Sequence, residues 1–226
     1  MTARKRPVGK AKKRVPARRA PTPRGVEREG KPIKRAAAAK ARPAAWAALR
    51  GFDPLGYAQG LIRDIKDFPQ PGILFRDITP LLADPKGFHV VIDALAERFV
   101  GEQVDAVVGI ESRGFIFGGA LAVRLNASFV PVRKGGKLPF RTDRVSYSLE
   151  YGEAELEMHR DALSEGANVL IIDDLLATGG TAAAAGELVQ RQGAFVAAYA
   201  FVVELEALGG RERLSPVPVV SLIAYD

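Results

Sequence analysis

The apolar residues of this chain change their arrangement at about Gly51. From there on, short apolar runs alternate with stretches in which apolar residues recur every three or four positions, the spacing of one helix face. The face of a helix predicted at 88–99 consists of Phe88, Val91, Ile92, Leu95 and Phe99. The run at 106–110 that follows is apolar throughout and ends at a polar cluster, so it predicts a buried strand.

The same alternation continues along the rest of the chain. Further strands are predicted at 128–132, 169–172, 195–203 and 219–224, and further helices at 115–125 and 182–192. Strands that alternate with helices indicate an α/β domain with a central, mainly parallel sheet covered on both faces. Ligands bind beyond the carboxyl ends of the strands in such sheets, so the residues just after each apolar run are candidates for a site.

Composition limits the class of protein. With 226 residues, 47% of them hydrophobic, the chain can bury one sizeable core. No run approaches the roughly 18 consecutive apolar residues of a membrane-spanning helix, and no signal-peptide pattern is present, so we expect a cytoplasmic protein without membrane contact. The chain has no cysteine and two histidines, His89 and His159, which excludes disulfides and leaves no local pair of metal ligands.

The net charge of +7 originates in the first 50 residues. They hold 17 Lys and Arg against 2 Glu, a charge of +15, whereas the remainder holds 16 against 24, a charge of −8. Such a composition cannot bury enough surface to offset the entropy of ordering, so residues 1–50 are predicted to be a disordered basic tail and residues 51–226 the folded domain. Three roles stay open for the tail: weak, nonspecific, salt-sensitive contact with nucleic-acid phosphates, organelle targeting, or an inert extension.

The strongest candidate site is the segment VLIIDDLLATGGT at 169–181, a buried strand followed by a small-residue loop and a helix. Glycines let backbone N–H groups converge on an anion, and the positive end of the helix dipole adds to the attraction. The adjacent carboxylates of Asp173 and Asp174 repel each other unless a ribose diol, with magnesium nearby, shares their charge. The chain has no GxxxxGK[ST], which argues against a nucleoside-triphosphate site; a simple helix-capping turn is the other alternative.

The run DDLLATGGT resembles the phosphoribosyl-pyrophosphate loop of type I phosphoribosyltransferases, in the form carried by the adenine-specific family. This resemblance implies the fold of those enzymes, a central mainly parallel sheet flanked by helices, with a small N-terminal hood. It also implies that Asp173 and Asp174 face the ribose hydroxyls and that the loop binds the ribose-linked phosphate. The implied phosphate-binding residues are Ala177, Thr178, Gly179, Gly180 and Thr181.

Two more segments that follow predicted strands resemble the pyrophosphate-binding elements of the family. In GIESRGFIFGGAL the resemblance implies a cis peptide bond between Glu111 and Ser112, and a catalytic contact from Arg113 to the leaving pyrophosphate. In FVPVRKGGKLPF it implies a cluster of cations and a mobile lid at about 134–148. The implied pyrophosphate-binding residues are Ser112, Arg113, Arg133, Lys134 and Lys137. Taken singly, the first segment could be a capping turn and the second a solvated loop.

Two other segments are expected to bind the base. YSLEYG resembles the element from which a glutamate approaches the purine, which makes Glu150 the catalytic candidate for proton transfer, with Tyr151 as its neighbour; a surface glutamate is the alternative. DFPQPGILFRDIT resembles the hood that recognises the base, at about 66–80. The implied adenine-binding residues are Leu74, Phe75 and Arg76. Phe75 would stack on the purine while the backbone of its neighbours reads the adenine edge, unless Phe75 is a core residue.

The resemblance extends from about Gly56 to Asp226 and implies the conversion of adenine and phosphoribosyl pyrophosphate to AMP and pyrophosphate, a step of purine salvage. Magnesium is expected to be carried by phosphoribosyl pyrophosphate and not by dedicated protein ligands, and the family implies a homodimer. Two rivals stay open: a regulator that senses phosphoribosyl pyrophosphate and binds nucleic acid through the tail, and a phosphoribosyltransferase for another purine base.

Overall fold

The computed structural model describes residues 51–148 and 153–226, which belong to one compact unit. The basic segment at 1–50 and the candidate residues Glu150 and Tyr151 lie outside the described residues. Within the described part of the chain, no helix has the length and apolar character needed to cross a membrane.

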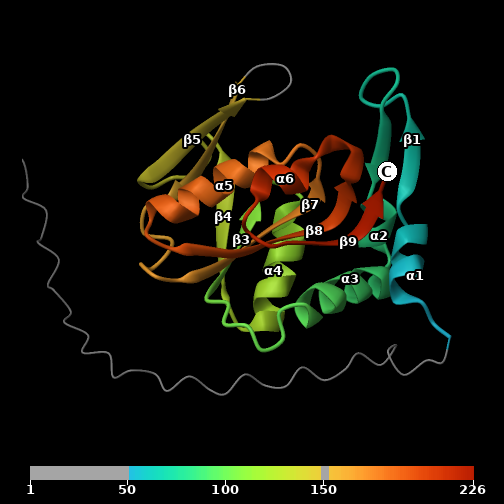
Figure 1. The fold of residues 1–226 in the computed structure, drawn as a ribbon, viewed down its shortest axis with the longest axis horizontal. Coiled ribbons are helices and arrows are strands. Elements are labelled where there is room, and N and C mark those ends of the chain that lie inside the picture. Colours follow the sequence, from blue (N-terminus) through green and yellow to red (C-terminus); the bar gives the residue numbers. More distant parts are fainter. Residues whose placement is uncertain (1–50, 149–152) are drawn as a thin grey trace, which may run out of the picture. The chain divides into compact units, whose positions relative to one another are not determined.

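A seven-stranded sheet forms the centre of this unit (Figure 1). Its strands lie in the order β5-β6-β4-β3-β7-β8-β9. The five neighbouring strands β4, β3, β7, β8 and β9 run parallel, whereas β6 is antiparallel to β4 and β5 is antiparallel to β6. The strands are β3 (Ala106–Ile110), β4 (Ser128–Lys134), β5 (Thr142–Ser148), β6 (Glu153–His159), β7 (Asn168–Leu176), β8 (Phe195–Leu205) and β9 (Val219–Tyr225). The predicted fold class, α/β with a mainly parallel sheet, is confirmed.

Both faces of the sheet are buried, each by a different group of helices. The helices are α1 (Pro54–Gly60), α2 (Thr79–Ala83), α3 (Pro85–Glu97), α4 (Gly114–Leu125), α5 (Gly180–Arg191) and α6 (Gly210–Leu214), with a short 3-10 turn, η2 (Glu206–Leu208). On β7, Leu170 and Ile172 belong to the core shared with α3 and α4, while Val169 and Ile171 belong to the core shared with α5. A parallel strand covered on both faces has no polar side, which explains the continuous apolar run VLII.

Two of the differences between the observed and the predicted elements affect the site. β7 does not end before the two aspartates but continues to Leu176, because its pairing with β8 persists, with Asp173 opposite Phe201 and Leu176 opposite Glu204. β5 and β6 were missed because they have no continuous apolar run of the kind that predicts the other strands; charged and apolar side chains alternate in RVSY and EAELEMH, the pattern of a strand with one apolar face.

A two-stranded hairpin, β1 (Arg63–Lys66) and β2 (Leu74–Asp77), overlaps the predicted hood at about 66–80. Arg63 and Asp77 pair across the hairpin, with 2.6 Å between Nη2 and Oδ2, and Thr79 at the start of α2 donates two hydrogen bonds to the other oxygen of Asp77. On the next position of β2, the guanidinium of Arg76 lies 3.7 Å from the centre of the Tyr225 ring in β9. The hairpin is thereby fastened both to α2 and to the last strand of the sheet.

Candidate active site

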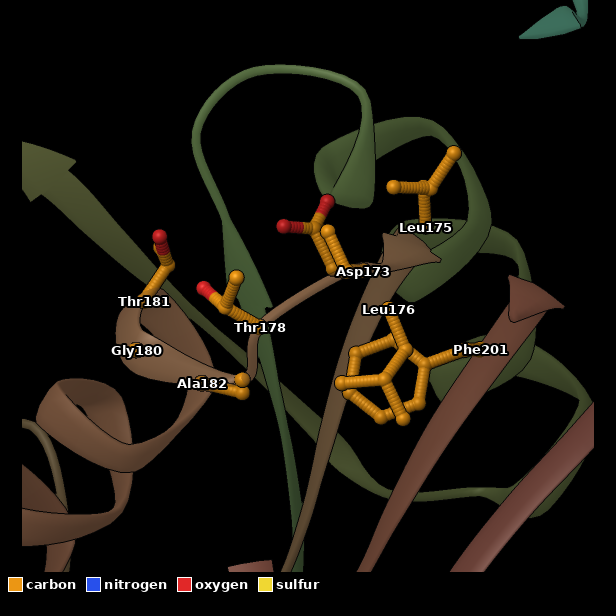
Figure 2. A pocket seen from close by; sticks show the side chains of 10 residues that line it. Asp173, Leu175, Leu176, Thr178, Gly180, Thr181, Ala182 and Phe201 are labelled. Atoms are coloured by element: carbon orange, nitrogen blue, oxygen red, sulfur yellow. The ribbon is translucent and has the colours of Figure 1, made fainter. Parts of the chain in front are cut away.

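The predicted phosphate loop lies between the end of β7 and the beginning of α5. Residues 177–179 connect Leu176 to Gly180, and the loop lines a cavity of about 190 Å³. Figure 2 shows the hydroxyl groups of Thr178 and Thr181 and the carboxylate of Asp173 on one side of the loop. The first N–H groups of a helix have no partner within the helix, and no side chain caps α5, so these donors are available to an anion.

Glycine is required in this loop by the close approach of α6. Gly179 has φ 76°, in the left-handed region, and a Cβ at this position would come within 2.7 Å of the carbonyl oxygen of Gly210. A Cβ on Gly210 would in turn lie 2.1 Å from the carbonyl oxygen of Ala177. The loop and the start of α6 therefore hold each other in place, and neither can carry a side chain at the contact.

The two aspartates of β7 stand between this cavity and a second one. Asp173 accepts a hydrogen bond from the backbone N–H of Asp174 at 2.8 Å, and Asp174, which is 4% exposed, lies 3.0 Å from Nε of Arg113. Burial raises the pKa of Asp173 well above its usual value, and the neighbouring Asp174 carboxylate raises it further. The pair concentrates proton affinity and negative charge at the point where a ribose diol is expected.

The second cavity, of about 430 Å³, is lined by the residues predicted to bind ribose or pyrophosphate other than Arg133 and Lys137, which pair with Glu111 of its lining. Its lining includes Glu111, Ser112, Arg113, Lys134, Tyr147, Asp173, Asp174 and Thr181. Because Asp173 and Thr181 also line the first cavity, the two cavities are neighbours. The structure therefore brings the predicted phosphate, ribose and pyrophosphate residues to one edge of the sheet.

The predicted pyrophosphate loop follows β3 directly. The peptide bond between Glu111 and Ser112 is cis, as predicted. The loop packs tightly on β7, since a Cβ on Gly114 would lie 2.8 Å from the carbonyl oxygen of Ile172. Arg113 is thereby held against β7, and its guanidinium faces Asp174 on one side and the ring of Phe75, 5.8 Å away, on the other.

The basic loop after β4 is held by two buried carboxylates. Glu111 accepts hydrogen bonds from Arg133 Nε at 3.0 Å and from Lys137 Nζ at 2.6 Å. Glu157 of β6, which is fully buried, accepts from the backbone N–H groups of Lys137 at 2.7 Å and Leu138 at 2.8 Å. Burial pushes the pKa of Glu157 upward, but hydrogen bonds from the backbone at 136–138 outweigh it and hold that pKa below its usual value.

The hood presents aromatic surface to the site. Phe75 is half-buried and packs edge-on against Phe68, with 5.1 Å between the ring centres. The guanidinium of Arg113 lies 5.8 Å from the centre of the Phe75 ring. Leu74 is 42% exposed, and Arg76 is committed to Asp64 and Tyr225. Phe75 is therefore not a closed core residue, and adenine binding by residues 74–76 stays a prediction.

Several residues at the site were not predicted from the sequence. Besides Glu157, they include Tyr147, whose hydroxyl oxygen accepts a 3.4 Å hydrogen bond from Thr181, and Arg213 of α6, whose Nη1 would lie 3.6 Å from a Cβ on Gly180. They come from segments far from the glycine loop in sequence, and no local pattern marks them. Among residues 51–148 and 153–226, no group of three or more His, Cys, Asp or Glu side chains could hold a metal ion.

Comparison with known proteins agrees with this geometry. Residues 77–221 match the family model of the phosphoribosyl transferase domain. The adenine phosphoribosyltransferase of Sorangium cellulosum is 62% identical over 183 residues, 79% of this chain and 92% of that protein. Among solved structures, that of Thermoanaerobacter pseudethanolicus adenine phosphoribosyltransferase has a TM-score of 0.74 at 48% identity, covering 76% of this chain and 99% of that one.

A further structure has bound ligands. The Saccharomyces cerevisiae adenine phosphoribosyltransferase, in complex with an imino-altritol bisphosphate and adenine, has a TM-score of 0.70 at 46% identity and covers 74% of this chain and 98% of its own. The family model spans well over half of the chain, and the relatives are matched over nearly their whole length. The chain therefore belongs to the adenine phosphoribosyltransferase family.

Proposed function

We propose that this site transfers the phosphoribosyl group of phosphoribosyl pyrophosphate to adenine, giving AMP and pyrophosphate, as a step of purine salvage. The observation that carries the proposal is the convergence of the glycine loop, the two aspartates and the arginine of the pyrophosphate loop on two adjoining cavities. The relatives have the adenine-specific name, which argues against an oxopurine substrate.

The residues divide the substrate among them. The backbone and hydroxyl groups at 177–181 bind the 5′-phosphate, and Asp173 and Asp174 accept hydrogen bonds from the ribose diol. The cations Arg113, Arg133, Lys134 and Lys137, with Ser112, bind pyrophosphate. Magnesium enters as part of the phosphoribosyl pyrophosphate substrate, and its charge lowers the repulsion between pyrophosphate and the aspartates.

The chemistry follows from these positions. The bond between the anomeric carbon and pyrophosphate breaks, the sugar gains oxocarbenium character, and adenine N9 forms the new bond as it loses its proton. Arg113 is placed to stabilise the negative charge that develops on the leaving group, because it is fixed by Asp174 before substrate binds. Glu150 is the proposed acceptor of the N9 proton, and closure of residues 134–148 would exclude water.

Assembly and location follow from family membership. We propose a cytoplasmic homodimer, with the exposed apolar side chains of α4, Ile116 at 44% and Val123 at 81% exposed, as part of its contact. For the basic segment at 1–50, weak phosphate-directed contact with nucleic acid is proposed.

The direct test is an AMP-formation assay on the full chain with phosphoribosyl pyrophosphate, magnesium and adenine. AMP should form with adenine and not with hypoxanthine, guanine or xanthine. A double variant, Asp173→Ala with Asp174→Ala, should lose turnover while its circular dichroism spectrum stays that of the parent. Absence of AMP formation by correctly folded parent protein would contradict the proposed activity.

A further inference from the structure

Three of the four cations assigned to pyrophosphate already have carboxylate partners inside the protein. Arg133 and Lys137 share Glu111, at 3.0 and 2.6 Å, and Arg113 lies 3.0 Å from Asp174. Asp174 has a separate task in ribose binding, but nothing in the proposed function uses the Glu111 carboxylate. It must therefore be explained by what it does to the cations around it.

Glu111 is a largely buried anion at the wall of the larger cavity. Its side chain is 9% exposed, and the residue lines the 430 Å³ cavity beside Ser112 and Arg113. Burial pushes the pKa of Glu111 upward, but hydrogen bonds from Lys137, the Lys134 backbone and Arg133 outweigh it and lower that pKa overall. A carboxylate that is ionised at neutral pH thus stands among the groups that the product pyrophosphate needs.

The backbone of the basic loop is held mainly by Glu157, which accepts the N–H groups of Lys137 and Leu138. Glu111 accepts one backbone N–H of this loop, that of Lys134, at 3.1 Å. Arg133 is itself part of β4 and is paired with Glu157 across the sheet. The two carboxylates therefore differ in emphasis: Glu157 fixes the backbone at 137–138, whereas Glu111 neutralises the side chains of Arg133 and Lys137 and binds one backbone N–H.

We propose that Glu111 is an internal counterion that competes with pyrophosphate for Arg133 and Lys137 and so weakens retention of the product. The proposal rests on the proposed function and adds a positioning residue to it. Without ligand, both cations are paired with Glu111, which itself lines the cavity. When pyrophosphate arrives, it takes over these hydrogen bonds but remains close to the displaced carboxylate, and the repulsion between the two anions favours release.

Glu111→Gln tests this with nearly unchanged shape. Titration calorimetry of the full chain with inorganic pyrophosphate in magnesium buffer should show a Kd about three- to tenfold lower than that of the parent, because one negative charge near the site is gone. Product inhibition by pyrophosphate should strengthen by the same factor. A residue that merely supported the loop would give the opposite sign, since its loss would weaken binding.

Two variants serve as controls. Glu155→Gln removes a carboxylate beside the same loop that pairs with Arg144 and not with Arg133 or Lys137, so the Kd for pyrophosphate should stay within about twofold. Glu157→Gln loosens the backbone of the loop and should weaken binding. If Glu111→Gln loses its native circular dichroism, Glu111→Ala removes the same charge without a side chain to misplace and should show the same tightening.

AMP separates failure of this inference from failure of the proposed function. AMP binds through the phosphate loop and hood, so its Kd should be equal in the parent and in Glu111→Gln. Unchanged or weaker pyrophosphate binding in Glu111→Gln, with AMP binding retained, would overturn the counterion role alone. A folded parent that binds neither AMP nor pyrophosphate would overturn the proposed function and the counterion role with it.

Discussion

The glycine loop at 177–181 and the basic loop at 133–138 are both proposed to bind phosphate groups, but they are prepared for an anion in different ways. The glycine loop offers backbone N–H groups and hydroxyls, and its shape is fixed by contact between Gly179 and Gly210. The basic loop offers full charges, and two of them are already paired with Glu111.

This difference fits the fates of the two phosphate groups. The 5′-phosphate is present in both substrate and product, so a rigid cradle of dipoles that needs no counterion can hold it throughout. In the proposed reaction pyrophosphate is separated from the sugar, and cations with an internal partner are not left as uncompensated charges when it leaves. The rigid glycine loop and the basic loop, whose cations exchange partners, are therefore expected to respond differently to mutation.

Gly179→Ala should disrupt the glycine loop at 177–181 and have the largest effect on AMP binding and turnover. The left-handed φ and the 2.7 Å approach to the Gly210 carbonyl oxygen leave no room for a methyl group. We expect AMP binding and kcat/KM to fall by about tenfold to a hundredfold, measured by calorimetry and steady-state kinetics. Gly136→Ala is the matched control, because Gly136 has φ 80° with open space around it, so AMP binding should not change.

Asp173→Asn should reduce turnover by about tenfold or more, through loss of the carboxylate that is proposed to accept a hydrogen bond from the ribose diol. The unliganded protein should nevertheless become more stable near neutral pH. The folded chain binds the Asp173 proton more tightly than the unfolded chain, so folding stability falls as pH rises from the ordinary carboxyl pKa through the raised one.

The measurement is the melting temperature of Asp173→Asn and parent as a function of pH. Their difference should be small below about pH 4 and grow as pH rises. A variant that is less stable than the parent at neutral pH would show that Asp173 contributes to folding more than its burial costs.

Asp77→Asn tests the hood, which belongs to neither loop. Hydrogen bonds from the Thr79 side chain and from Arg63 lower the pKa of Asp77 to about 2. The stabilisation is fully present above the unfolded pKa of 3.8 and is lost as pH falls toward 2. We expect a loss of about 1–2 kcal/mol at pH 7 in urea unfolding and a raised KM for adenine. An equal loss at pH 2 would contradict this origin.

Arg213→Ala should give the smallest effect. Arg213 is the cation beside Gly180, so its removal should raise the KM for phosphoribosyl pyrophosphate about twofold to fivefold at low salt and less at high salt. Arg98→Ala changes the charge equally at a cavity lined by the other ends of β7, β8 and β9 and should leave this KM unchanged. Equal effects of the two variants would rule out a local role for Arg213.

Local patterns predicted much of this protein, and distant contacts account for what they missed. The strand, glycines and helix at 169–181 lie in one continuous segment, so the loop could be located from the sequence. Glu157 and Arg213 have charges typical of surface residues, and their roles depend on β6 and α6 folding back to the loops. Glu111 was noted only for its peptide bond, because nothing near it in sequence identifies the cations that it neutralises.

The stacking of Arg76 on Tyr225 joins a segment that is translated early to the strand that is translated last. During translation, the hood hairpin is made before β9, so the Arg76 guanidinium cannot stack on the Tyr225 ring until the whole central sheet has been translated. Before β9 is made, the hairpin proposed to recognise the base is fastened to α2 alone, through Asp77 and Thr79, so the proposed discrimination among purines should be the last property that the growing polypeptide gains.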